Sequence, residues 1–348
     1  MNFAGNQVSD NALTYFLDQE SNVPLLKAAD VILRVNMKKL KLFPRLIREA
    51  TNSHWSHSGL IYVPADRRRG FDNTFLVEAT TKGVRMASWR QEVLPFHLMT
   101  IGVKRLPMDW YTETPYELNR HNRFDPEDQH GIGYLRHVRG MALDHINDLY
   151  NHSAVYEMAA RYSERFLSQN AKAIPGLVEG VAGLANFFKH MDESTSKSPS
   201  LMRFMCSGLV QFSFFEALRN QIAMDLDIPA HREAAERNLA NMHQVVFRED
   251  DTEGVIDRYI HDVQTGKRSI KDNLPGEVYD FLQTATPADF NFSRKLKWQY
   301  IDYRGAVWEI HEVPDGYQPA SKEEAEVLST MQPLHKKTSI PLLQAQPS

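Results

Sequence analysis

The single cysteine of this chain, Cys206, limits what can hold the fold together. One cysteine forms no disulfide within the chain and cannot supply a multi-cysteine zinc site. The fold must therefore come from the packing of apolar strands and helices. The 348 residues are 42% hydrophobic, which is enough for one large core with added helices or for two modest domains. By composition alone, a lone cysteine is most often a small buried apolar residue.

Charge and terminal sequence narrow the classes of protein. The net charge is −4, which argues against a nucleic-acid protein that relies on attraction to phosphates. The N-terminal residues lack the basic start and apolar run of a secretory signal, and no run of apolar residues is long enough to span a bilayer. We expect a protein that is cytoplasmic where it is synthesised, with secretion that needs no signal peptide as the alternative.

Two segments leave room for contact with a membrane surface. The basic amphipathic stretch from Lys38 to Thr51 is most often a solvated face over the core, and the alternative is a patch that contacts a membrane surface or an anionic substrate. The apolar segment 174–188 contains three glycines and Glu179. It reads either as a buried loop and helix near the site, or as a cover over an acyl-binding groove.

We predict that the first third of the chain consists mainly of strands, with a helix at the N-terminus and a second helix after the first strand. An N-terminal helical segment is predicted over 1–27, with helical spacing of apolar residues over 10–29. Pro44 suits the first turn of a further helix. The first part of the core spans 28–106, where β-branched and alternating runs predict a set of strands: 29–35, 57–63, 74–79, 84–89 and 99–106.

The remainder is mainly helical. Residues 107–200 read as a helical insertion, with amphipathic helices over 135–149 and 155–167 and the polar linker 191–200 at its end. Residues 201–225 read as an apolar helix. The segment 226–317 combines helices with a hairpin whose strands, 296–303 and 306–313, flank Arg304-Gly305. The tail, 318–348, is predicted to be mobile. These patterns together predict an α+β fold with an antiparallel sheet.

Cys206 stands near the start of the apolar helix, which favours a reactive thiol. Unpaired N–H groups at a helix N-terminus stabilise a thiolate and can hold a developing oxyanion. Ser207 and Gly208 are small, so we expect substrate to approach the backbone closely there. A cysteine nucleophile also needs a base, and the base needs an orienting group.

Among 14 histidines, His57 is the best candidate for the base. It begins one strand, and Glu78 lies in the strand that returns. A hairpin that folds about the middle of its loop places them directly opposite, with Cβ atoms about 5 Å apart. His54 is the competing base, or a residue that contacts substrate. Trp55 is either a substrate wall or part of the core, and the Met and Phe residues around Cys206 are either core or an acyl groove.

One helical face carries further histidines and aspartates. His145, Asp148 and His152 are spaced so that they share a side of a helix, which is compatible with a metal site. A solvated polar face is the more frequent meaning of this pattern. The thiol chemistry itself requires no metal and no other cofactor.

The order of these motifs resembles a known superfamily. The motifs are Asp30 to Leu33, Ser56 to Tyr62, Val77 to Ala79 and Cys206 to Val210. They are similar to the circularly permuted branch of the NlpC-type papain-like superfamily, which includes YiiX/YebB-like bacterial proteins and the lecithin:retinol acyltransferase group. The resemblance covers residues 28–106 and 201–220. The long insertion and the C-terminal region depart from the pattern.

The resemblance implies a papain-like cysteine hydrolase with Cys206 as nucleophile, His57 as base and Glu78 as the third polar residue. It implies His54, Trp55 and Ser207 beside the substrate. The permuted branch suggests an ester or amide bond of a lipid or acyl substrate, cleaved through a thioester by a hydrolase or an acyltransferase. The unpermuted relatives suggest a peptidoglycan or peptide amidase, including an exported effector. A binding protein that only uses the fold is the non-enzymatic alternative.

Overall fold

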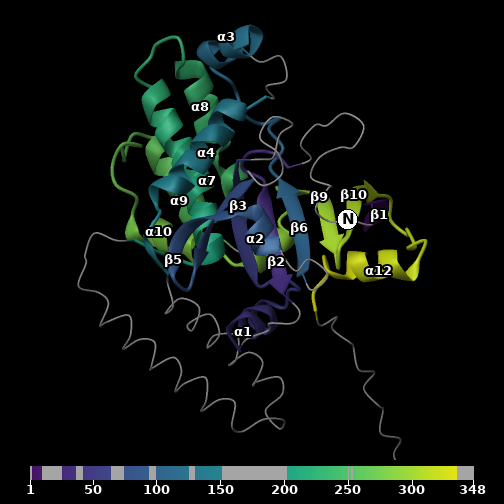
Figure 1. The fold of residues 1–348 in the computed structure, drawn as a ribbon. Helices are drawn as coiled ribbons and strands as arrows, with labels where there is room; N and C mark the ends of the chain where they lie inside the picture. Colours follow the sequence, from purple (N-terminus) through teal and green to yellow (C-terminus); the bar gives the residue numbers. More distant parts are fainter. Residues whose placement is uncertain are drawn as a thin grey trace, which may run out of the picture.

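The computed structural model describes most of the chain (Figure 1). The described residues are 2–9, 26–36, 42–63, 74–93, 99–124, 130–150, 202–249, 251 and 254–334. They form helices and an antiparallel sheet, so the predicted α+β class is confirmed. The predicted helix over 155–167, the apolar segment 174–188 and the linker 191–200 lie outside the described residues.

The main sheet has eight strands in the order β1-β10-β9-β6-β2-β3-β4-β5. Its strands are β1 Asn2–Ser9, β2 Val31–Asn36, β3 His57–Val63, β4 Phe75–Thr80, β5 Gly83–Ser88, β6 Met99–Arg105, β9 Lys297–Tyr303 and β10 Ala306–Val313. All their pairings are antiparallel. Two short strands, β7 Leu149–Tyr150 and β8 Arg203–Phe204, pair in parallel.

The helices gather mainly beside the β3–β5 side of the sheet, whereas α12 lies at the opposite end (Figure 1). They are α1 Leu42–Thr51, α2 Trp89–Val93, α3 Pro115–Phe124, α4 Ile132–Asp144, α7 Cys206–Asp225, α8 Arg232–Ala240, η3 Met242–Val245, α9 Val255–Gln264, α10 Gly276–Gln283, α11 Pro287–Phe292 and α12 Lys322–Ser329. The longest, α7, packs against β3 and β4.

The five predicted strands of the first third of the chain are confirmed as β2 to β6, with bounds that differ by one or two residues. The C-terminal hairpin is confirmed as β9 and β10, with Arg304 and Gly305 in its turn at φ of 55° and 98°. Two central residues with positive φ suit a tight hairpin whose twist matches its strands. The hairpin belongs to the main sheet, because β9 pairs with β6.

Both ends of the chain differ from the prediction. The N-terminal helix over 1–27 is wrong at its start, because Asn2–Ser9 is a strand that pairs with β10, and residues 26–29 form a bend and turn. Residues 10–25 lie outside the described residues. The mobile tail is wrong for 322–329, which form α12. Ser321 caps this helix by accepting from the Glu324 N–H, and Val327 is fully buried.

The helical insertion is confirmed in α3 and α4 and is wrong at its end. The helix predicted over 135–149 stops at Asp144, and Leu149–Tyr150 forms β7 instead. The cause is a pair of hydrogen bonds to β5. The Asp148 carbonyl accepts from the Val84 N–H, and the Asn147 N–H donates to the Val84 carbonyl, so the chain runs along β5. Asn147 turns the chain with a φ of 75°.

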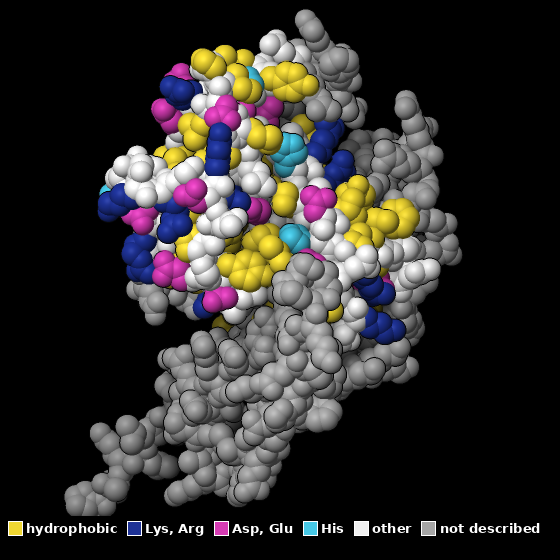
Figure 2. All heavy atoms as spheres, turned by 90° about the vertical axis from the view of Figure 1, so that its left-hand side faces the viewer, with side chains coloured by type: hydrophobic (Ala, Val, Ile, Leu, Met, Phe, Trp, Pro, Cys, Tyr) yellow, Lys and Arg dark blue, Asp and Glu magenta, His cyan; other side chains and the backbone are white. Residues whose placement is uncertain are grey.

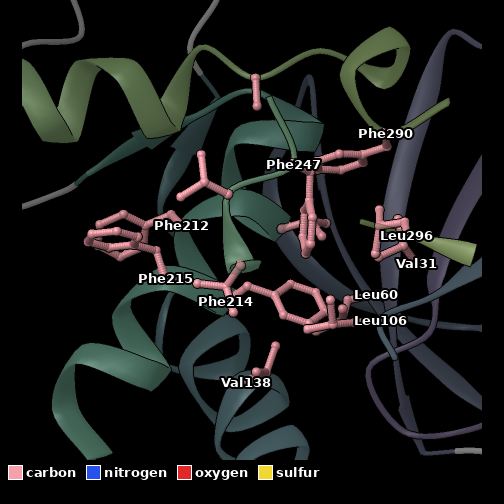
Figure 3. Packing of buried hydrophobic residues seen from close by; sticks show 14 of the residues in the cluster. Val31, Leu60, Leu106, Val138, Phe212, Phe214, Phe215, Phe247, Phe290 and Leu296 are labelled. Atoms are coloured by element: carbon pink, nitrogen blue, oxygen red, sulfur yellow. The ribbon is translucent and has the colours of Figure 1, made fainter. Parts of the chain in front are cut away.

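Alternation along the strands divides the core into two clusters. Val31 and Leu33 of β2 belong to the larger cluster, which also holds the apolar face of α7 (Figure 3). Ile32, between them, belongs to the smaller cluster on the other face of the sheet. Successive strand residues point to opposite faces, so one strand supplies both clusters.

The helical side of the molecule carries a mixed surface. Figure 2 shows basic and acidic side chains interspersed with hydrophobic ones there. Among the described residues of this face, the charges do not form the single-sign basic surface that phosphate backbones attract. In the described part of the chain, no helix combines the length and the apolar character needed to cross a membrane.

Candidate active site

Cys206 is the first residue of α7, as its sequence context predicts. The preceding residue, Met205, is extended (φ −72°, ψ 159°) and offers no side-chain cap. The N–H groups of the first helical turn have no acceptor within a helix, so they are donors that a ligand can use. Cys206 itself is 1% exposed.

His57 is the first residue of β3 and makes a hydrogen bond with the Cys206 thiol. Its Nε2 lies 2.8 Å from Oε2 of Glu78. With Nε2 held by the carboxylate, Nδ1 is the ring nitrogen that remains for the thiol. The structure thus brings Cys206, His57 and Glu78 together, in the order predicted for a nucleophile, its base and an orienting carboxylate.

The predicted register of β3 and β4 is wrong by two residues. Leu60 pairs with Val77 and Ile61 with Leu76, so Glu78 is a diagonal neighbour of His57 and not its direct partner. A shift of two residues keeps both side chains on one face, whereas a shift of one would have separated them. Gly59 makes room for the diagonal contact: a Cβ atom there would lie 3.4 Å from Cβ of Glu78.

The ladder between β3 and β4 stops at the Leu60–Val77 pair, before it reaches Ser58. The Ser58 N–H is therefore free of a β4 acceptor and donates to the Cys206 sulfur. The Ser58 hydroxyl also lies 2.9 Å from the Ser207 hydroxyl. These two contacts attach the start of α7 to the start of β3.

Glu78 is completely buried and lies between two arginines. Arg34 of β2 contacts Oε2, the same oxygen that His57 contacts. Arg85 of β5 donates to Oε1 from Nη2 at 2.6 Å and from Nε at 3.0 Å. Burial opposes ionisation of Glu78, but Arg34, His57 and Arg85 hold the pKa of this carboxyl well below its usual range.

These side chains form a row across four neighbouring strands, here called the charge row: Arg34, His57, Glu78 and Arg85. Arg34 pairs with His57 in the β2–β3 ladder, and Glu78 pairs with Arg85 in the β4–β5 ladder. Sequence reasoning missed both arginines. The available signal was a charged residue inside the otherwise apolar run of β2, because such a charge is buried only when it is paired.

The charge row tunes the thiol and its base. Burial raises the pKa of Cys206, but His57 and the hydrogen bonds from Ser58 and Ser207 outweigh it and lower this pKa to about 7. Burial also opposes the charge on His57, yet Cys206 and Glu78 raise the pKa of His57 to about 9. Between these values a thiolate faces an imidazolium, which is the reactive form of a cysteine nucleophile.

His54, the competing base, is less suited to the role. Burial and the nearby Arg48 lower the pKa of His54 to about 4. Its Nε2 is buried without a hydrogen-bond partner among the described residues, and its ring packs edge-on against Trp55 at 5.3 Å between centroids. These contacts connect His54 to the core, and none of them leads to Cys206.

Trp55 and Ser207, which are predicted to lie beside the substrate, are both buried, as Cys206 is. Trp55 is fully buried, donates from Nε1 to Asn291 Oδ1 at 3.2 Å and packs against Trp298, so it belongs to the core. Ser207 is also fully buried, where it joins α7 to β3. Gly208 leaves no room for a side chain, because a Cβ atom there would lie 1.9 Å from the Gln283 carbonyl oxygen at the end of α10.

His145 and Asp148, two of the residues suggested as a metal site, follow the end of α4 and do not lie on the helix itself. His145 Nδ1 lies 2.8 Å from Asp148 Oδ2, and its ring packs against Phe204. His152 lies outside the described residues.

Comparisons of the chain with models of protein families, with curated proteins and with solved structures find no match. The candidate site therefore stands on its own geometry.

Proposed function

We propose that the protein is a papain-like cysteine hydrolase or acyltransferase that cleaves an ester or amide bond through a thioester on Cys206. The observation that carries the proposal is the placement of Cys206 at the first turn of α7, hydrogen-bonded to His57, whose Nε2 contacts Glu78 at 2.8 Å. A buried thiol with a base and an orienting carboxylate is the arrangement that nucleophilic acyl transfer requires.

The reaction follows from these groups. His57 takes the thiol proton, and the Cys206 sulfur attacks the carbonyl carbon of the substrate. N–H groups of the first turn of α7 stabilise the resulting oxyanion. His57 then donates the proton to the leaving oxygen or nitrogen, and a thioester remains. Water or an acceptor alcohol or amine, deprotonated by His57, attacks the thioester and regenerates the thiol.

The preferred substrate is a lipid or acyl compound, as the resemblance to the permuted branch implies, and the protein would act in the cytoplasm or after secretion without a signal peptide. A peptidoglycan or peptide amide is the second substrate class. The acyl groove suggested over 174–188 lies outside the described residues. The choice between substrates therefore depends on assay.

The test compares the purified chain with Cys206→Ala on phospholipid vesicles and on peptidoglycan fragments. We expect release of fatty acid by the wild type and at least about a thousandfold loss in the variant, because the nucleophile is missing. Turnover of peptidoglycan fragments alone would reject the lipid substrate. Turnover that survives Cys206→Ala would reject the mechanism.

A further inference from the structure

The carboxylate oxygen of Glu78 that does not contact His57 is also held in place. Oε1 accepts both hydrogen bonds from Arg85, and Nη2 of Arg85 also donates to Oε1 of Glu92 at 2.5 Å. The other oxygen of Glu92 accepts from Nη1 of Arg34 at 3.2 Å. Glu92 thus links the two arginines that contact Glu78.

The support for this network comes from a different element than the strands of the site. Glu92 lies in the short helix α2, which begins immediately after β5. Trp89, the first residue of α2, is fully buried, and its N–H donates to the Thr74 carbonyl at 2.9 Å. These contacts fix the position of α2 next to the sheet.

We propose that Arg85 and Glu92 are positioning residues that hold Oε1 of Glu78, so that Oε2 points at His57 and keeps the imidazole directed at Cys206. This inference rests on the proposed function, because it assigns a role in the same thiol chemistry. Neither residue is placed in contact with the reacting atoms. Arg85 and Glu92 act only through Glu78.

Charge balance gives the proposal a directional consequence. The two arginines and two glutamates have a formal sum of zero, so the Cys206–His57 pair experiences a compensated field. Arg85→Gln makes the surroundings one charge more negative, so protons are held more tightly on His57 and Cys206. Glu92→Gln makes them one charge more positive and has the opposite effect. The double variant restores the charge balance but not the hydrogen bonds to Oε1, so we expect its two pH limbs to return to their wild-type positions and its maximal alkylation rate to stay below that of the wild type.

The measurement is the rate at which iodoacetate alkylates the protein, followed from pH 5 to 10. Cys206 is the only cysteine, so alkylation reports on this thiol alone. The anionic reagent favours the thiolate–imidazolium form, and the profile therefore rises with ionisation of Cys206 and falls with deprotonation of His57. We expect both limbs to move by about half a pH unit, upward in Arg85→Gln and downward in Glu92→Gln, since partial exposure screens the charges.

Matched controls come from the exposed pair on α8, Arg237 and Glu233, substituted in the same way. These controls change net charge equally and should leave the profile in place. Shifts of Arg85→Gln and Glu92→Gln in the same direction would overturn the proposal, as would a double variant that matches the wild type both in the pH of its limbs and in its maximal rate. A conserved fold by circular dichroism with opposite shifts supports it, because a purely structural role does not reverse sign.

The outcome is separable from that of the proposed function, because alkylation needs no substrate. A two-limbed wild-type profile without turnover of any ester or amide rejects the hydrolase and leaves the positioning role supported or overturned by the variants. A wild-type profile without two limbs overturns the thiolate–imidazolium pair, and the positioning role with it.

Discussion

Buried charges lie on both halves of the eight-stranded sheet, and the two halves stabilise them differently. In the charge row on β2 to β5, each buried charge contacts an opposite charge. On β6 and β9, Lys104 is 1% exposed and donates to three backbone carbonyls, those of Phe290, Asn291 and Ser293. Asp302 is 3% exposed and accepts from the Gly305 N–H.

This difference distinguishes the charge row, a candidate functional site, from Lys104 and Asp302, which support the structure. The charge row includes a titratable histidine, reaches solvent through Arg85 and ends at a thiol. Lys104 ties β6 to the end of α11, and Asp302 ties the β9–β10 turn to its own strand. A buried ionisable group is therefore not sufficient to indicate chemistry. A nucleophile and a partly exposed base must accompany it.

The strongest way to break this comparison is to remove the carboxylate at the centre of the charge row. Glu78→Gln leaves Arg34 buried without its full counter-charge, and we expect a loss of about 3 kcal/mol in the free energy of unfolding. Chemical denaturation measures it. Glu312→Gln, which removes one partner of the exposed pair with Lys297, should cost less than about 1 kcal/mol.

A second variant checks the cause of the loss. In Glu78→Gln with Arg34→Met, the buried guanidinium that has lost its contact with the Glu78 carboxylate is gone as well, so the double variant should be more stable than Glu78→Gln alone. Equal losses in Glu78→Gln and Glu312→Gln would show that the charge row contributes no more than a surface ion pair.

Local patterns made much of the fold and site predictable. The runs of β-branched residues fix β2 to β6, and Arg304-Gly305 fixes the C-terminal hairpin. The place of Cys206 at the start of a helix was predictable because a polar linker precedes an apolar helical run. The place of His57 at the start of a strand was predictable from the β-branched run that follows it. Each of these features is decided by residues that are close in the sequence.

Features that depend on distant residues were missed. Pairing of β1 with β10 joins residues about 300 positions apart. The sequence of Asn2–Ser9 shows little of the apolar–polar alternation that predicts a strand. The register of β3 and β4 depends on the course of the loop between them, which sequence does not specify. Arg34 contacts Glu78 across 44 positions of sequence, and only the order of the strands in the sheet brings the two together. The packing of Gln283 against Gly208 likewise joins distant residues.

If Lys104 has only a structural role, its substitution lowers the free energy of unfolding and leaves the reactivity of Cys206 unchanged. Lys104→Met leaves three carbonyls of the α11 end without their donor, and we expect a loss of about 2 kcal/mol in the free energy of unfolding. The alkylation rate of Cys206, measured on folded protein, should stay within about twofold of the wild type, because no charge-row residue contacts Lys104. A large fall in that rate would join the two halves into one functional network.

At Asp302 the size of the expected effect depends on pH, and its sign does not. Burial raises the pKa of Asp302 to about 7, opposed only in part by the Gly305 N–H. A carboxyl whose pKa is raised in the folded state binds its proton more tightly there than in the unfolded chain. The folded state therefore loses stability as the pH rises from the unfolded pKa, near 4, through about 7.

Asp302→Asn removes this dependence and keeps a side-chain oxygen for Gly305. We expect the variant to be more stable than the wild type at pH 8 by about 1 to 4 kcal/mol, with the difference vanishing below pH of about 4. Thermal unfolding across this range measures it. A variant that is destabilised at pH 8 would mean that the ionised carboxylate is itself stabilised in the fold. Asp302 would then resemble Glu78 of the charge row, and the distinction between the two halves of the sheet would fail.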